Sequence, residues 1–295
     1  MLRAPYQHLN KLIFSSYTML ESILIILTLF TLTIASYTDL KKREVPDWLS
    51  YAFLISALGI RFIFALSSTW AIFVSGLAGF FLFWGIGYLF YKIDQWGGGD
   101  AKLLMGLGAV IGLSLPFESN SLLLIWFFLL LLLVGAFYGL CWITVLALKR
   151  GKTFLTEFSD NVSHFSSLQK IVIVLTVLLV LLTVYNYLFW PLLLLPLPMF
   201  YLFMLVHTVE KSCFYKTLPL SKLTEGDWLA EKIKVGSRII PEKTLEKADL
   251  LLLQKQKKVK SVLIKEGIPF IPGFLLSYLT FLLTTSYWNT IVKIF

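Results

Sequence analysis

The sequence is poor in charged residues and in the side chains that bind metals. Charged residues make up 15% of the 295 positions, and the chain has three histidines and two cysteines. Neither the cysteines, Cys141 and Cys213, nor the histidines show the spacing of a metal site. We therefore expect no metal and no cofactor.

Apolar residues are in excess. They make up 58% of the chain, and the mean hydropathy is +0.80, which is typical of polytopic membrane proteins. A bilayer core about 30 Å thick requires about 20 apolar residues per helix. The sequence predicts an all-α polytopic membrane protein of about eight transmembrane helices, with a small mixed cytoplasmic insert before the last one. The expected spans lie near residues 19–38, 49–67, 70–91, 101–115, 121–148, 170–189, 191–209 and 268–295.

The chain divides by composition into a transmembrane core over 1–209, a soluble insert over 210–267 and a last span over 268–295. Within the insert, "PEKTLEKADLLLLQKQKK" predicts a helix that starts near Pro241, and "KVKSVLIKEG" predicts a strand. Glycines on the expected spans predict close helix packing. They are Gly76, Gly79, Gly85, Gly87, Gly106 and Gly108.

Lysine and arginine are absent from alternate connections between the spans, near 67–70, 115–120 and 189–191. They gather instead in the other connections, for example at 41–43 and 149–152. Cytoplasmic loops collect positive charge, so we place the basic loops and the insert in the cytoplasm. The net charge of +9 then reflects topology and contact with anionic membrane lipid, and we expect no nucleic-acid partner.

Two acids stand at the cytoplasmic ends of expected spans. Asp39 ends the first span in "YTDLKKREVPDWL", and Asp100 begins the fourth in "QWGGGDAKLL". An acid at membrane depth is costly and indicates function, although either acid alone is also typical of a helix cap. Two facing carboxylates can hydrolyse a peptide bond, because the ionised one activates water and the protonated one polarises the carbonyl.

At these residues the chain resembles the GxGD aspartic proteases of membranes. Within that group it is similar to the type IV prepilin and archaeal preflagellin (archaellin) peptidases. The resemblance rests on "GGGDAKLL", on the pattern around Asp39, and on "KEGIPFIPGFLL" at 265–276. It covers residues 19–115 best and 225–276 next.

The resemblance implies an aspartic endopeptidase of the cell membrane, with its active site at the cytoplasmic face. It implies cleavage of the basic leader of pilin-like or archaellin precursors, with Asp39 and Asp100 as the catalytic pair. The chain lacks the CxxC pairs of bacterial members, so we expect cleavage without N-methylation. The insert before "KEGIPF" favours the archaeal type.

Other motif residues have secondary roles in this interpretation. Gly97, Gly98 and Gly99 would let a peptide approach and let the loop move, and Lys102 would tune the charge of the pair or snorkel. Three more acids would contact the basic leader. The alternative for each is that it is an ordinary solvent-exposed loop residue with no role in binding. They are Glu44, Asp47 and Asp94.

A proton-coupled membrane transporter is the alternative function, because carboxylates on a broken helix also serve such carriers. A transporter would place its acids near the membrane midplane and show two similar halves. The acids here lie at the ends of spans, and the sequence shows no half-repeat. A catalytically silent scaffold is a third possibility, which Glu or Asn at position 39 or 100 would have favoured.

Overall fold

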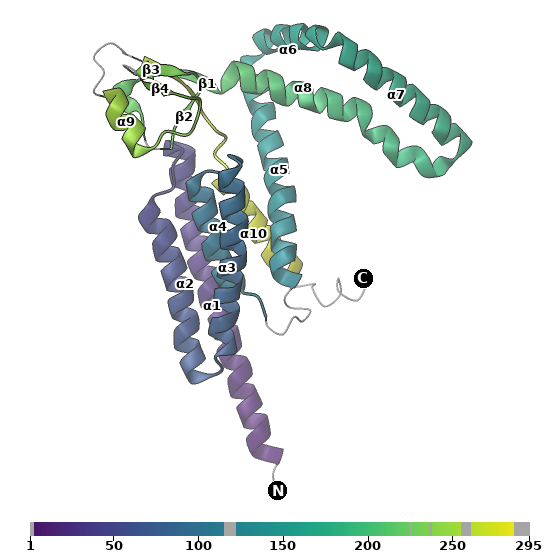
Figure 1. Cartoon of the computed structure of the whole chain (residues 1–295). Coiled ribbons are helices and arrows are strands. Elements are labelled where there is room, and N and C mark those ends of the chain that lie inside the picture. Colours follow the sequence, from purple (N-terminus) through teal and green to yellow (C-terminus); the bar gives the residue numbers. More distant parts are fainter. Residues whose placement is uncertain (1–2, 115–121, 225, 236–237, 255–260, 286–295) are drawn as a thin grey trace. The chain divides into compact units, whose positions relative to one another are not determined.

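The computed structural model describes residues 3–114, 122–224, 226–235, 238–254 and 261–285 (Figure 1). The chain forms two compact units. The first unit comprises Met1–Gly139 and Ile268–Phe295, and the second comprises Leu140–Gly267.

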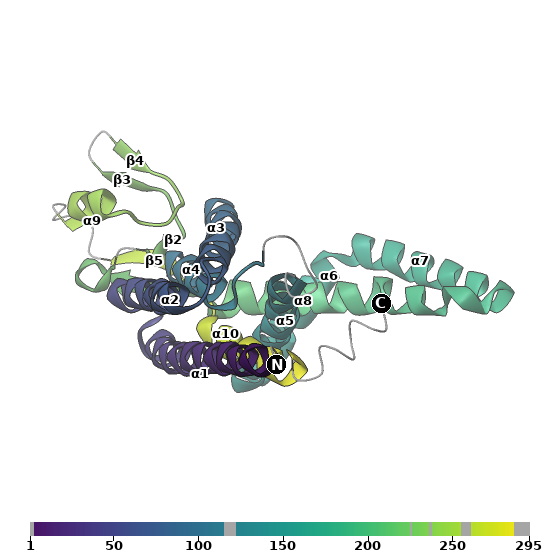
Figure 2. The ribbon, with the colours of Figure 1, turned by 90° about the horizontal axis from the view of Figure 1, so that it is seen from below.

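The first unit is a helical bundle, seen end-on in Figure 2. In it, α4 packs against α2 and α3, while α10 packs against α1. The bundle contains α1 (Arg3–Lys42), α2 (Asp47–Ser67), α3 (Ala71–Lys92), α4 (Gly98–Ile111), the first part of α5 (Leu122–Arg150) and α10 (Ile271–Thr285).

Helix α4 lies in the core of this bundle. It has 14 residues, and its buried side chains occur on all of its faces. Leu103, Leu104, Leu107 and Ala109 are completely buried. A helix that is apolar all round is a buried helix, so neighbouring helices must approach it closely on several sides.

Glycines make this approach possible. A Cβ on Gly79 of α3 would lie 2.2 Å from the carbonyl oxygen of Gly108 on α4, and one on Gly108 would lie 2.3 Å from that of Gly79. A Cβ on Gly106 would lie 2.3 Å from the ring of Phe53 on α2. The predicted close packing is therefore confirmed at these three glycines.

The same prediction holds for two further glycines and is wrong for one. Added Cβ atoms would meet Arg61 at 2.5 Å from Gly76, and Ala101 at 3.2 Å from Gly87. Gly85 has no such atom within 4 Å. Gly85 is exposed on α3 and does not touch α4. The presence of a glycine in the sequence does not show which face of the helix it occupies.

A buried arginine, Arg61 of α2, holds the end of α4. Its side chain donates hydrogen bonds to the carbonyl oxygens of Val110 (2.6 Å) and Ile111 (3.2 Å) at the C-terminus of α4. It also donates to the carbonyl oxygen of Ile72 and to the Ser75 hydroxyl on α3, both at 2.9 Å. The last carbonyls of a helix have no partner within the helix, and a cation there also complements the helix dipole.

The helices confirm an all-helical polytopic membrane protein. Among the described residues, six helices are long and apolar enough to cross a bilayer. They are Met19–Lys42, Asp47–Ser67, Ala71–Lys92, Leu122–Arg150, Ser166–Tyr185 and Tyr187–Cys213. The other two expected spans correspond to the shorter α4 and α10, and residues 286–295 of the last one lie outside the described residues.

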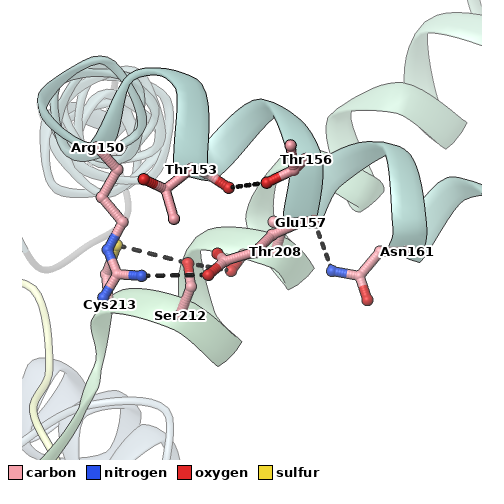
Figure 3. A network of polar contacts seen from close by, with 8 residues as sticks. All are labelled: Arg150, Thr153, Thr156, Glu157, Asn161, Thr208, Ser212 and Cys213. Atoms are coloured by element: carbon pink, nitrogen blue, oxygen red, sulfur yellow. Dashed lines mark hydrogen bonds and ion pairs between the residues drawn. The ribbon is translucent and has the colours of Figure 1, made fainter.

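The second unit begins with helices. After the end of α5 come α6 (Lys152–His164), α7 (Ser166–Tyr185), η2 (Tyr187–Leu194) and α8 (Pro196–Cys213). Polar contacts join α6 to its neighbours (Figure 3). Asn161 donates to the Thr208 hydroxyl of α8 at 3.1 Å, and Arg150 pairs with Glu157 at 3.4 Å.

The insert forms a small mixed subdomain in this unit. Strand β5 (Ser261–Lys265) lies between β1 (Tyr215–Pro219) and β2 (Trp228–Leu229), antiparallel to both. The other elements are η3 (Leu220–Lys222), the β3 (Ile233–Val235) and β4 (Arg238–Ile240) hairpin, and α9 (Lys247–Gln254). Its core consists of Leu223, Leu229, Ile233, Ile240, Leu245, Leu253, Val262 and Ile264.

The predicted strand of the insert is confirmed as β5, but the start of its helix differs. Helix α9 begins at Lys247 and not near Pro241. Glu242 and Lys243 form a bend, and Thr244 forms a β-bridge with Trp228, so these residues are not helical. Asp249 then accepts the Glu246 N–H at 3.3 Å, and this cap sets the start of the helix.

We expect Gly79→Ala to destabilise the protein by about 1–3 kcal/mol, because the added methyl group collides with the α4 backbone. Gly85→Ala on the same helix is the matched control. It has open space and should be neutral or stabilising by up to about 1 kcal/mol, since alanine favours helix. Unfolding of both variants in detergent measures the difference, and equal stability would contradict the packing.

We expect Arg61→Met to lower the free energy of unfolding by about 2–4 kcal/mol, because buried carbonyls at the end of α4 lose their donors. Arg61→Lys keeps the positive charge but has fewer hydrogen-bond donors. Its free energy of unfolding should therefore fall by less than that of Arg61→Met. Denaturant titrations of the two purified variants test this. An Arg61→Met protein as stable as the wild type would show that these hydrogen bonds contribute nothing.

Candidate active site

Asp39 lies in the last turn of α1 and reaches the beginning of α10. Its side chain is buried, with 7% exposure. Its Oδ2 accepts the N–H of Ile271 at 2.9 Å, and the Phe270 N–H also donates to this carboxyl group. The first N–H groups of a helix lack partners and carry its positive end, so α10 stabilises negative charge on Asp39.

The chain turns sharply after Asp39. Arg43 takes a left-handed conformation (φ 59°), and its N–H donates to the Asp39 carbonyl oxygen at 2.8 Å. This is a common way to end a helix. It also leaves the Arg43 charge within electrostatic reach of the Asp39 carboxylate.

Asp100 lies in the first turn of α4 and caps that helix. Its Oδ2 accepts the N–H of Gly97 at 3.0 Å. The fourth expected span was placed from 101, whereas α4 begins at Gly98, so Gly98 and Gly99 belong to the helix. A Cβ on Gly99 would lie 3.1 Å from Cβ of Val45, so glycine here permits close contact with the α1–α2 connection.

The structure brings the two acids together. The carboxylates of Asp39 and Asp100 are close enough for their charges to interact, although they come from different helices. Two carboxylates this close resist being ionised together. A pair with one proton contains both the base and the acid that peptide hydrolysis needs.

Lys102 forms an ion pair with another of the predicted site residues. Its Nζ forms an ion pair with Asp47 at 2.5 Å, at the start of α2, and lies 5.4 Å from the centroid of the Tyr51 ring. Asp47 is 66% exposed in this pair, and exposed ion pairs contribute about 0–1 kcal/mol. The contact joins the first turns of α2 and α4 next to Asp100.

Glu44 and Asp94 are exposed in the connections on either side of the two catalytic candidates. Asp94 has a left-handed backbone (φ 55°) in the turn after α3. Contact of these acids, or of Asp47, with a substrate remains a prediction. Among the described residues, no cluster of three or more histidine, cysteine or acidic side chains could hold a metal ion.

Several residues near the site were not singled out in the sequence. Tyr138 of α5 lies within electrostatic reach of both Asp39 and Arg43, and Phe270 and Ile271 supply the amides that Asp39 accepts. Their distance along the chain hides this role, since Ile271 is 232 positions from Asp39. The "IPFIPG" stretch at 268–273 was the one local indication of Phe270 and Ile271, because it belongs to the stretch that carries the family resemblance.

Comparisons with known proteins cover the part of the chain that contains both candidate acids. The model of the type IV leader peptidase family matches residues 26–150. Curated relatives include preflagellin peptidases from Methanococcus maripaludis (35% identical over 83 residues) and Methanococcus voltae (36% over 85). A third is the preflagellin peptidase of Methanocaldococcus jannaschii (35% over 81).

The M. maripaludis alignment covers 27% of this chain and 35% of the relative. The corresponding shares are 28% and 36% for M. voltae, and 27% and 34% for M. jannaschii. The chain therefore spans about a third of the length of the curated relatives it matches. No solved structure gives a significant match. The segment that contains Asp39 and Asp100 thus lies within the match to the type IV leader peptidase family, residues 26–150.

Proposed function

We propose that this chain is a membrane aspartic endopeptidase that removes the leader peptide from archaellin or pilin-like precursors. The observation that carries the proposal is the pairing of Asp39 with Asp100, which interact across two helices inside the family segment. The curated relatives named preflagellin peptidase favour an archaellin precursor.

The hydrogen bonds suggest a role for each acid. Asp39 accepts two backbone N–H groups at the positive end of α10 and lies near Arg43. Asp100 accepts one backbone N–H and faces the charge of Asp39. Because donors and cations favour the ionised form, Asp39 is the starting base and Asp100 holds the shared proton.

The reaction then follows from this arrangement. Asp39 takes a proton from water while the oxygen attacks the peptide carbonyl, and Asp100 donates its proton to the carbonyl oxygen. The tetrahedral gem-diol intermediate then collapses and the C–N bond breaks. The leaving amine takes the proton held by Asp39, and one hydroxyl of the gem-diol returns its proton to Asp100 as the product carboxyl group forms. The pair ends with one proton between its members, ready for another cycle.

The charge pattern supports cleavage at the cytoplasmic face. Basic residues follow Asp39 directly at 41–43, and such residues collect on the cytoplasmic side. The exposed acids Glu44 and Asp94 lie in connections on the same side of the expected topology, where a basic leader would remain. We propose cleavage without N-methylation, since the sequence contains no CxxC pair.

We expect Asp39→Asn and Asp100→Asn each to reduce cleavage by at least about 100-fold, because each change keeps the size and removes the titrating group. The assay follows the mass of an archaellin precursor incubated with membranes that contain each variant. Asp160→Asn, an exposed acid on α6, is the control and should cleave like the wild type.

The same assay separates the alternatives. An Asn variant that inserts normally and still cleaves would remove that aspartate from the mechanism. If the wild type cleaves neither archaellin nor pilin-like precursors, the peptidase proposal fails and proton-coupled transport becomes the function to test. A mass increase of the new N-terminus by one methyl group would contradict cleavage without methylation.

A further inference from the structure

We propose that the beginning of α10, Phe270 to Phe274, positions both members of the aspartate pair. The inference rests on the proposed function and deepens it, because it assigns positioning residues to the same site. It comes from two independent sets of contacts, one made by backbone amides and one by aromatic rings.

The first set fixes Asp39. Helix α10 starts after Ile268, Pro269 and Phe270, none of which has a side-chain acceptor that could cap it. The cap comes from α1 instead, through the bond from the Ile271 N–H to Asp39 Oδ2 and the donation from Phe270. The orientation of the Asp39 carboxylate therefore depends on where α10 begins.

The second set of contacts fixes the chain segment that directly precedes Asp100. Trp96, directly before Gly97, stacks on Phe90 of α3 with centroids 4.6 Å apart. Its ring also contacts Phe270 (6.2 Å) and Phe274 (5.7 Å) of the α10 start. Since the Gly97 N–H is the donor to Asp100, these rings hold the segment that orients Asp100.

The beginning of α10 is itself firmly seated. Ile271 and Phe274 are completely buried, and Phe270 and Phe274 contact one another edge to face at 5.7 Å. A Cβ on Gly135 of α5 would lie 2.7 Å from the Phe270 ring. One rigid turn thus contacts the immediate surroundings of both carboxylates, so a displacement of that turn would change both.

Ile271→Pro tests the first set of contacts. Proline removes the N–H that Asp39 accepts, and a helix tolerates proline at its first residue. Losing a donor to the ionised carboxylate makes ionisation harder. We expect the acidic limb of the pH profile of kcat/KM to move up by about one pH unit or more, with a lower kcat.

Ile271→Ala is the control, because it shortens the side chain further than proline does but keeps the N–H. It should retain the wild-type acidic limb even if it unfolds at a lower temperature. Identical pH profiles for Ile271→Pro and Ile271→Ala would overturn the role of the amide. Failure of the peptidase proposal would look different, since the wild type itself would then cleave no precursor.

Trp96→Leu tests the second set and does not depend on Ile271→Pro folding. It removes the ring contacts with α10 while leaving the Asp39 amides in place, so kcat should fall about tenfold at an unchanged KM. Trp84→Leu, a partly exposed tryptophan on α3 outside this ring cluster, is its control. A Trp96→Leu enzyme with wild-type kcat would overturn the proposal.

Discussion

The architecture of the helical bundle depends on satisfying the ends of one short helix. Helix α4 has 14 residues, so it is about 21 Å long and cannot cross a bilayer core of about 30 Å. In an apolar surrounding, unpaired backbone groups are costly. Arg61 supplies donors at one end of α4, and Asp100 supplies an acceptor at the other.

The same requirement explains how two carboxylates can be held together in this bundle. Asp100 caps its own helix α4, and Asp39 caps the distant helix α10. Capping and catalysis are therefore compatible roles for these acids. The caps hold the two side chains in place, and in the proposed mechanism the repulsion between them keeps one proton on the pair.

Local sequence signals predicted the class of protein correctly, and they singled out Asp39 and Asp100 as the candidate pair. Long apolar runs and the two motifs around Asp39 and Asp100 are each contained in short stretches, so they can be read without tertiary structure. The strand predicted from residues 258–267 is also present, as β5. These features depend on neighbours along the chain.

The remaining features depend on contacts between distant residues. Arg61 was hidden because an arginine inside an apolar run gives no indication of which carbonyls it meets on α3 and α4. Gly85 was assigned to a packed face that its position on α3 does not reach. The contact of Asp39 with Ile271 links residues at opposite parts of the sequence.

The most direct test of this account is whether Asp39 and Asp100 lie side by side in the membrane. Asp39→Cys and Asp100→Cys would be combined in a chain whose Cys141 and Cys213 are replaced by serine. The protein is then treated with a short reagent that joins two thiols. Mass spectrometry of the fragments reports whether the two positions are joined.

We expect a cross-link within one molecule for this pair. No cross-link is expected for Asp39→Cys combined with Ser67→Cys, because Ser67 lies at the far end of the 21-residue helix α2, about 30 Å away along its axis. Separate labelling of both thiols at positions 39 and 100, with no cross-link, would contradict the paired site.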